Sequence, residues 1–97
     1  MFIIHKTEYF DEWLKLKDVK VKARILIRLK RAELGNLGDH KIVGDGVFEM
    51  RIDYGSGYRV YFVKSKGIII ILLSGGDKSS QSRDIIKAKK IASEIGA

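Results

Sequence analysis

The sequence predicts a small α+β domain in which helices pack against an antiparallel sheet, in the order strand, helix, helix, three strands, helix. Three observations predict this class: two stretches near the start with apolar residues at helical spacing, two alternating stretches in the second half, and one continuous apolar run after them. The chain has 97 residues, enough to bury one core, so we expect a single domain over residues 1–97.

The N-terminal part is predicted to contain one strand and two helices. Residues 2–4 are apolar and form the short strand. Thr7 and Asp18 are suited to cap the two helices that follow, and Gly35 or Gly38 to end the second. After the caps, apolar residues recur at helical spacing, first at Phe10, Trp13, Leu14 and Leu16 and then at Val21, Ile25, Leu29 and Ala32.

Residues 47–53 and 58–63 are predicted to form a hairpin. Both stretches alternate with a period of two, and a short glycine-rich turn separates them. One register places their apolar residues on a single face. It pairs Ile52 with Tyr58, Met50 with Val60 and Phe48 with Phe62.

The same register places Arg51 directly opposite Arg59. Like charges that face each other across a ladder cost up to about 1 kcal/mol, so we expect an anion between the two arginines. In the alternative interpretation, Glu49 and Asp53 screen them on an ordinary solvated face. In both cases Arg59 is expected on a polar face, where truncation to alanine changes stability by less than about 0.5 kcal/mol.

Residues 68–73 are apolar at both parities, which is typical of a strand covered on both faces. We expect this strand at the centre of the sheet or under the last helix. In the segment GGDKSSQ, residues 75–81, Gly75 and Gly76 are predicted to form a tight strand-to-helix turn, and Ser79 or Ser80 to cap the closing helix. The apolar side of that helix comprises Ile85, Ala88, Ala92 and Ile95.

The chain is strongly basic, with a net charge of +7 and a pI near 9.7. This charge favours a polyanionic partner such as RNA, or an acidic protein that neutralises it. The second predicted helix has no acidic residue between Val19 and Ala32 and carries a basic stripe, formed by Lys20, Arg24, Arg28 and Arg31. Such a stripe is either an ordinary solvated face or a surface for phosphates or an acidic partner segment.

Composition also limits the kinds of site and location. The chain has no cysteine, which excludes disulfides and thiolate metal sites, and its two histidines are too few for a metal centre, so we expect neither metal nor cofactor. The start lacks the features of a signal peptide, and the longest apolar run, residues 68–73, is far shorter than a bilayer span of about 20 residues. We therefore expect a cytoplasmic protein without a membrane partner.

Three segments carry a resemblance to a known family. They are residues 44–52 (GDGVFEMRI), 57–62 (GYRVYF) and 72–81 (LLSGGDKSSQ), the last followed by Asp84, Ile85 and Ala88. Together with the length, element order and basicity, they resemble the RelE/ParE toxin superfamily. The likeness is greatest to its addiction-module killer proteins, which are related to HigB-type toxins and phage-derived Gp49-like proteins. It covers nearly the whole chain and implies a small RelE/ParE-like domain.

The resemblance implies a toxin of a type II toxin–antitoxin pair, commonly an endoribonuclease that cuts messenger RNA in the ribosomal A site. It also implies a cognate antitoxin, in this branch often a helix-turn-helix DNA-binding protein. Contact with DNA is then indirect, through the antitoxin complex. The ribosome and messenger RNA are the other expected partners.

Metal-free RNA cleavage by the ribose 2′-hydroxyl requires groups that remove a proton, neutralise the phosphorane oxygens and support the departing 5′-oxygen. Arginine suits the second task because its planar fork donates paired hydrogen bonds to phosphate. By resemblance, Arg59 matches the arginine that related nucleases place beside the scissile phosphate. Arg51 joins it through the register, Lys78 supplies a second cationic group, and Asp45 is a candidate base. Further candidates for contact with RNA, the ribosome or the antitoxin are His40, Lys41 and Tyr61.

One departure from the family leaves a second function open. Many ribosome-dependent relatives have a tyrosine near the C-terminus that stacks on a base or aids proton transfer, whereas this chain has no tyrosine, histidine or tryptophan after Tyr61. Base stacking and proton transfer are then carried out by Tyr54, Tyr58, Tyr61 or His40, or are absent. The alternative function is a non-enzymatic toxin that binds a protein target, as the gyrase-poisoning ParE proteins do.

Overall fold

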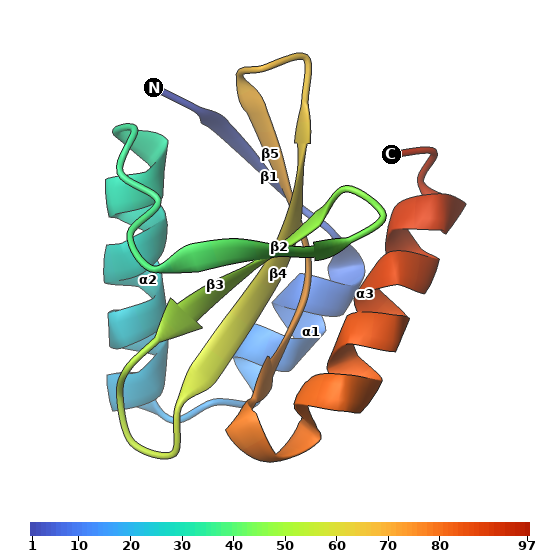
Figure 1. Cartoon of the computed structure of the whole chain (residues 1–97). Coiled ribbons are helices and arrows are strands. Elements are labelled where there is room, and N and C mark those ends of the chain that lie inside the picture. The colour runs from blue at the N-terminus through green and yellow to red at the C-terminus, as the bar shows by residue number, and fades with distance from the viewer.

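One five-stranded sheet separates two helical layers in the computed structural model, which describes all 97 residues of the chain (Figure 1). In chain order the elements are β1 (Ile3–Lys6), α1 (Glu8–Lys15), α2 (Val19–Glu33), β2 (His40–Gly44), β3 (Val47–Ile52), β4 (Tyr58–Ser65), β5 (Ile69–Asp77), the 3-10 turn η1 (Lys78–Ser80) and α3 (Gln81–Glu94). The predicted class and element order are confirmed, with β2 as an additional strand. None of the three helices is long and apolar enough to cross a membrane.

The strand order in the sheet is β1-β5-β4-β3-β2. All neighbours pair antiparallel except β1, which runs parallel to β5, so the predicted antiparallel sheet is correct for four of its strands. As expected, β5 lies inside the sheet. The sequence prediction missed β2 because it is an edge strand whose first three residues are exposed, and an edge strand with little burial carries a weak apolar pattern.

The predicted hairpin register is confirmed at every position. Ile52 pairs with Tyr58, Met50 with Val60, Phe48 with Phe62, and Arg51 with Arg59. A register that is one residue off would move the buried apolar face of the hairpin to the opposite side, which is why the alternating pattern fixes it.

The first two helix caps are the predicted ones. The Thr7 hydroxyl accepts a hydrogen bond from the Phe10 N–H at 3.2 Å, and the Asp18 carboxylate accepts one from the Val21 N–H at 3.0 Å. Gly35 follows the end of α2 with a φ of 107°, a left-handed conformation that glycine adopts at little cost.

The cap of the closing helix differs from the prediction. Ser80 occupies the N-cap position of α3 but makes no capping side-chain hydrogen bond. Asp77 takes this role one turn earlier, where its carboxylate accepts from the Ser79 N–H at 2.9 Å and from the Ser79 hydroxyl at 2.6 Å. These hydrogen bonds, chiefly the one from the Ser79 hydroxyl, lower the pKa of the Asp77 carboxyl.

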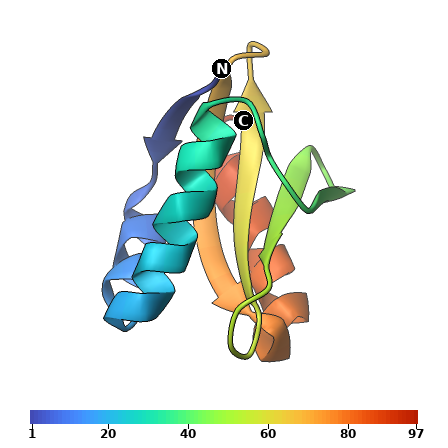
Figure 2. The same ribbon diagram turned by 90° about the vertical axis from the view of Figure 1, so that its left-hand side faces the viewer.

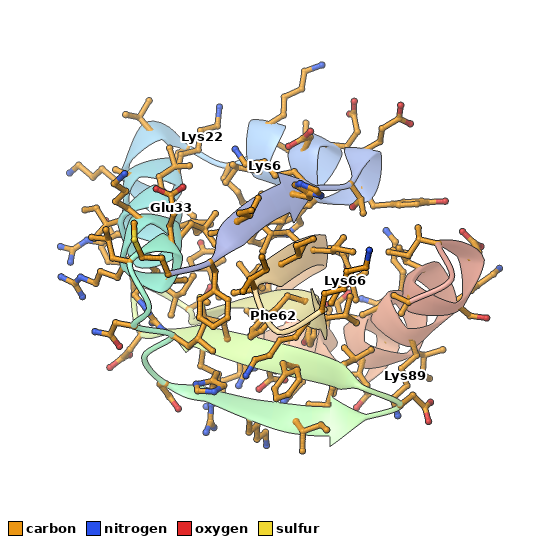
Figure 3. The ribbon with its side chains drawn as sticks, turned by 90° about the horizontal axis from the view of Figure 1, so that it is seen from above. Lys6, Lys22, Glu33, Phe62, Lys66 and Lys89 are labelled. Carbon is orange, nitrogen blue, oxygen red and sulfur yellow. The ribbon has the colours of Figure 1, made fainter.

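Each face of the sheet has its own core. The face under α1 and α2 holds a cluster of 12 buried apolar residues, among them Phe10, Ile25, Met50 and Phe62. The opposite face holds seven, including Tyr61 and Leu73, which pack against Ala88 and Ile91 of α3. The two views in Figures 2 and 3 show α2 and α3 on opposite sides of the sheet, with Phe62 in the interior.

Gly75 and Gly76 do not form the predicted turn. Both lie within β5, and neither has a positive φ. A Cβ atom at Gly75 would overlap the Trp13 ring on one face of the sheet, and one at Gly76 would overlap the Asp84 carboxylate on the other. The two glycines therefore let a side chain from each helical layer lie directly on the strand.

Candidate phosphate-binding site

A cavity of about 250 Å³ opens where β3, β4 and η1 meet. It is lined by Asp39, Arg51, Ile52, Asp53, Gly57, Tyr58, Arg59 and Lys78. Three of the residues predicted for catalysis, Arg51, Arg59 and Lys78, thus lie around one hollow, although they come from three separate elements. Two carboxylates, Asp39 and Asp53, share it with them.

Backbone pairing brings the three cationic residues together. Arg51 and Arg59 are direct partners across the β3–β4 ladder, and Arg59 pairs on its other side with Gly76 of β5. Two residues after Gly76, the Lys78 N–H donates to the Gly57 carbonyl oxygen at 3.1 Å, which joins η1 to the hairpin turn. The backbone positions of the three residues are therefore fixed by the sheet and by its hydrogen bond to η1, rather than by a free loop.

The charge between the two arginines is supplied by Glu49. Its Oε1 lies 3.4 Å from Arg59 Nε and 3.9 Å from Arg51 Nε, and its side chain is fully buried. Its Oε2 accepts a hydrogen bond from Gln81 Nε2 at 2.8 Å. The expected anion is thus partly internal, as in the screening alternative. Arg51 also pairs with Asp39, with 3.4 Å between Nη2 and Oδ1.

The expectation of an open polar face around Arg59 is wrong. Arg59 is only 9% exposed, because α3 covers the face of the sheet that Arg59 shares with Tyr61. The sequence pattern did not indicate this cover, since the alternating polar residues of β3 and β4 are typical of a solvated face. Arg51 is more open, with 42% of its side chain exposed. Truncation of Arg59 is therefore not a surface substitution.

Tyr61 lies on the predicted face, yet it is fully buried and belongs to the core under α3. Burial, followed by the nearby Glu49 carboxylate, raises the pKa of its hydroxyl. The hydroxyl has no hydrogen-bond partner. Tyr61 is therefore not placed to stack on RNA or to contact an antitoxin, in contrast to the prediction. Tyr58, by comparison, lines the cavity and packs against the other core.

The basic stripe on α2 is interrupted at Arg28. Its guanidinium donates to the carbonyl oxygens of Arg51 at 2.5 Å and Leu37 at 3.1 Å, so it joins α2 to β3 instead of facing a partner freely. Burial is the main cause that lowers the pKa of Arg28. The other members, Lys20, Arg24 and Arg31, are exposed. The stripe therefore has three exposed cations and one structural anchor.

A second cavity, of about 270 Å³, connects the stripe to the candidate site. It is lined by Arg24, Ile27, Arg28, Arg31, Ile52, Asp53 and Tyr54, and so shares Ile52 and Asp53 with the first cavity. The Arg24 guanidinium lies 4.8 Å from the centre of the Tyr54 ring, within the range of a cation–π contact. Basic groups and an aromatic ring thus continue the surface of the site towards α2.

The structure does not bring Asp45 to the cavity. Asp45 lies in the β2–β3 turn with a φ of 53°, 3.9 Å from the Lys89 ammonium. Asp45 is six positions before Arg51 in the chain, and an extended chain spans up to roughly 20 Å over six positions. His40 and Lys41 are exposed on the edge strand, next to the site but not lining the cavity, and His40 Nδ1 is 2.8 Å from the Gly38 carbonyl oxygen.

Besides Asp53, which lines the cavity, three polar residues of the site were not predicted as functional. Asp39 and Gln81 gave no pattern in the sequence, because their positions depend on β2 and on the placement of α3. Glu49 could have been found from the sequence, because the alternation with a period of two places it on the same face of the sheet as Arg51 and Arg59. No three His, Asp or Glu side chains gather as a group that could hold a metal ion.

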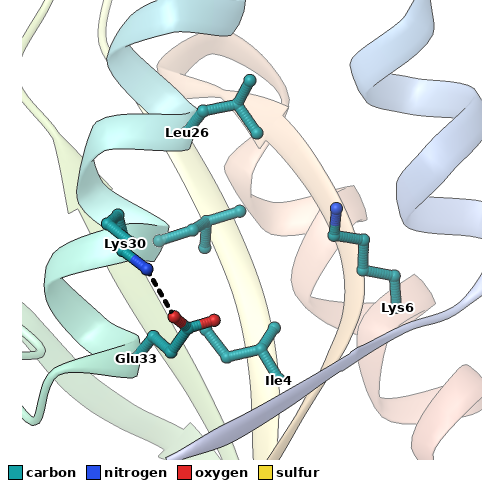
Figure 4. Close-up of a pocket in the computed structure, with 6 residues that line it drawn as sticks. Ile4, Lys6, Leu26, Lys30 and Glu33 are labelled. Carbon is teal, nitrogen blue, oxygen red and sulfur yellow. Dashed lines mark hydrogen bonds and ion pairs between the residues drawn. The ribbon is translucent and has the colours of Figure 1, made fainter.

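A hollow of about 300 Å³ between β1 and α2 contains none of the predicted site residues. It is lined by Ile4, Lys6, Leu26, Leu29, Lys30 and Glu33. Within it, Lys30 Nζ and Glu33 Oε1 form an ion pair at 2.9 Å, marked by the dashed line in Figure 4. The phosphate-binding candidate is therefore the cavity at the end of β3 and β4.

Residues 12–94 match the family described as phage derived protein Gp49-like (DUF891). The chain belongs to this family. An uncharacterized protein of Haemophilus influenzae (strain ATCC 51907 / DSM 11121 / KW20 / Rd) is 54% identical to this Gp49-like chain over 94 residues, which cover 96% of the chain and 95% of the relative. The family expected from the sequence is confirmed.

Two solved structures have the same fold as this Gp49-like chain. The intact E. coli RelBE toxin–antitoxin complex contains a chain that aligns with a TM-score of 0.67 and 14% identity, over 79% of this chain and 96% of that one. The isolated E. coli RelE toxin aligns with a TM-score of 0.67 and 14% identity, over 90% and 97%. The predicted RelE-like fold is therefore correct.

Proposed function

We propose that this chain is the toxin of a type II toxin–antitoxin pair and that it cleaves messenger RNA on the ribosome without a metal ion. The observation that carries the proposal is the cavity of about 250 Å³ lined by Arg51, Arg59 and Lys78. Three cations around one small hollow suit a phosphate group, which they bind through charge-assisted hydrogen bonds.

In the proposed reaction, the ribose 2′-oxygen attacks the adjacent phosphorus and forms a bond to it, while the bond from phosphorus to the 5′-oxygen breaks. The proton of the 2′-hydroxyl passes to a base, and the departing 5′-oxygen takes a proton from an acid. The products are a 2′,3′-cyclic phosphate and a 5′-hydroxyl. We assign Arg51 and Arg59 to the phosphorane oxygens and Lys78 to the leaving oxygen.

The base is assigned to a carboxylate within the cavity. Asp39 and Asp53 both line it, whereas Asp45 lies at the other end of β3. Asp39 is already engaged by Arg51, with 3.4 Å between Asp39 Oδ1 and Arg51 Nη2, so one of its oxygens faces a cation. Asp53 is exposed and forms no ion pair, so it is the better candidate.

The surface next to the cavity supports an RNA strand that continues towards α2. Arg24 and Arg31 offer charges for backbone phosphates, and the Tyr54 ring offers a platform for a base in place of the missing C-terminal tyrosine. Bases stack on aromatic rings with little regard to sequence. Lys20, Lys41 and His40 are further exposed groups for contact with the ribosome or an antitoxin.

The comparisons support an antitoxin as the partner in this proposal. One of the two structures with the same fold is a toxin in complex with its antitoxin, and the other is a toxin alone. A net charge of +7 suits an acidic antitoxin segment. If that antitoxin is a helix-turn-helix protein, DNA contact is indirect. The proposed location is the cytoplasm, where ribosomes and messages occur.

Expression of the protein alone, followed by primer extension on a reporter message, tests the proposal. We expect growth arrest and cuts inside the coding region that vanish when the reporter's start codon is removed. Cuts that persist without translation contradict dependence on the ribosome. Gyrase-linked DNA breaks without RNA cuts contradict the nuclease and favour a toxin that binds a protein target.

A further inference from the structure

Glu49 lies behind the two arginines, on the side away from solvent. Its side chain has no exposed surface, and one of its oxygens is 3.4 Å from Arg59 Nε and 3.9 Å from Arg51 Nε. Both contacts use the Nε atoms, so Glu49 leaves the terminal nitrogens of Arg59 available to a group in the cavity. One terminal nitrogen of Arg51, Nη2, also lies near Asp39. The carboxylate is thus placed to set the direction of both guanidinium planes.

Glu49 is itself held from a third side. Gln81, the first residue of α3, donates from Nε2 to its second oxygen at 2.8 Å. No exposed loop residue takes part, so the carboxylate is fixed between β3, β4 and the start of α3. A shift of α3 would move Glu49, and with it the arginines.

The charge of Glu49 acts against simple attraction of an anion. A buried carboxylate lowers the positive potential of the cavity, and burying its charge costs free energy that the ion pairs at 3.4 Å and 3.9 Å offset only in part. A hollow that needed only positive charge would bind phosphate better with a neutral residue here. The contribution of Glu49 to the site therefore lies in orientation.

Side-chain polar atoms without a hydrogen-bond partner concentrate on this face. All five that are buried lie here: Glu49 Oε1, Arg51 Nε, Arg59 Nε, the Tyr61 hydroxyl and the Ser74 hydroxyl. Glu49 meets the two Nε atoms at ion-pair distance but without hydrogen-bond geometry. Most buried polar groups are fully paired, and exceptions mark places where function sets the geometry.

We propose that Glu49 is a positioning residue, which holds the Arg59 and Arg51 guanidinium groups in the orientation that receives a phosphate, and that Gln81 transmits the position of α3 to them. The catalytic part of this inference rests on the proposed function. The orientation itself does not, because it concerns only the free protein.

The orientation is tested first by NMR of the arginine Nε–H groups in the free protein. In wild type, the Arg59 Nε–H should exchange slowly with water. In Glu49→Gln, which keeps the shape and removes the charge, we expect its signal to move and its exchange to accelerate about 10-fold or more. Glu33→Gln, on the surface of α2, is the matched control and should leave the signal in place. An unchanged Arg59 signal in a folded Glu49→Gln protein overturns the proposal.

Inorganic phosphate is the probe for binding. If Glu49 only orients the arginines, Glu49→Gln should bind phosphate as tightly as wild type or tighter, because the net charge of the cavity rises by one. A ribosome-dependent cleavage assay should nevertheless show kcat reduced by about 10- to 100-fold with KM unchanged or lower, since small misplacement of a catalytic group is costly. A purely structural ion pair predicts no such split between kcat and KM in the folded protein.

The two parts can fail separately. If wild type cleaves no RNA while the Arg59 signal responds to Glu49→Gln, the proposed function is wrong and the positioning of the guanidinium groups stands. If wild type cleaves RNA and Glu49→Gln cleaves it at the same rate, the positioning role is wrong and the proposed function stands.

Discussion

The two faces of the sheet are covered in different ways. The face under α1 and α2 buries a continuous cluster of 12 residues that are all apolar. The face under α3 buries seven apolar residues and, beside them, the polar residues Glu49, Arg59 and Ser74. One face is an ordinary core, and the other is a core that changes into a charged site as β3 and β4 approach η1.

This difference shows how a small domain can stabilise itself and still hold a reactive surface. The apolar face contributes stability through the burial of large side chains. The α3 face contributes less stability, because it keeps charged groups partly desolvated and next to a cavity. We therefore expect substitutions on the first face to act through folding alone and those on the second face to have smaller effects on stability and to alter the site as well.

The largest effect is expected from a charge on the apolar face. Val60 has no exposed surface, so Val60→Asp buries an unpaired carboxylate and costs several kcal/mol, a large part of the total stability of a small domain. The variant should show no cooperative thermal transition by circular dichroism. Ser56→Asp, in the exposed β3–β4 turn, is the matched control and should melt like wild type. A folded Val60→Asp protein would contradict the assignment of this face as the main core.

The next largest effect is expected at Arg59. Arg59→Ala leaves the buried Glu49 without its nearer cation and should lower the free energy of unfolding by about 2 kcal/mol in urea titrations. In a Glu49→Gln background the same truncation should cost less than half as much, because no buried charge is stranded. Arg51→Ala, on a side chain that is 42% exposed, is the control and should cost less than about 1 kcal/mol. Equal costs for Arg59→Ala in both backgrounds would show that the pair does not contribute.

A smaller effect is expected for the anchor in the basic stripe. Arg28→Ala removes two hydrogen bonds to carbonyl oxygens of β3 and of the segment after α2, and should cost about 1 to 2 kcal/mol. Arg24→Ala, on the exposed part of the stripe, should leave stability within about 0.5 kcal/mol but weaken binding of single-stranded RNA, most clearly at low salt. If Arg28→Ala unfolds at the same urea concentration as Arg24→Ala, the anchor is not needed.

The smallest effect is expected from Tyr61→Phe at neutral pH, because the hydroxyl that it removes has no hydrogen-bond partner. Burial raises the pKa of Tyr61 in the folded protein above its ordinary value of 10.0. The unfolded chain therefore loses this proton first, and wild type should lose stability as the pH rises above about 10. We compare the urea midpoints of wild type and Tyr61→Phe at pH 8 and at pH 10.5. The two proteins should unfold at the same urea concentration at pH 8, and Tyr61→Phe should unfold at a higher urea concentration than wild type at pH 10.5. An equal difference in urea midpoint between the two proteins at pH 8 and pH 10.5 would contradict the raised pKa of Tyr61.

The sequence allowed the hairpin register to be predicted because alternation and burial leave a single solution. Arg51 and Arg59 were therefore placed opposite each other correctly, and the GGDKSSQ segment led to Lys78. The cover of the second face could not be predicted in this way. A pattern of polar residues at alternate positions looks the same whether water or a partly polar helix faces it, so the burial of Arg59 and Tyr61 was missed.

Other differences follow from contacts between distant residues. Asp39 reaches Arg51 only because β2 adds to the sheet edge, and Gln81 reaches Glu49 only because α3 starts beside β3. The two glycines of β5 were interpreted as a turn, since local sequence cannot show that Trp13 and Asp84 lie on the backbone there. Local pattern therefore predicted strands and charges, while tertiary packing decided which of them meet.

The most direct test of the proposed site is Lys78→Ala in the ribosome-dependent cleavage assay. The Lys78 side chain is exposed and its backbone hydrogen bond to Gly57 survives the substitution, so the thermal transition should not move. Lys90→Ala, an exposed lysine on α3, is the matched control for the loss of one charge. If the cavity of Arg51, Arg59 and Lys78 binds the scissile phosphate, Lys78→Ala should cleave messages about 10²-fold more slowly than wild type while Lys90→Ala cleaves normally. Equal cleavage by Lys78→Ala, Lys90→Ala and wild type would contradict the phosphate site.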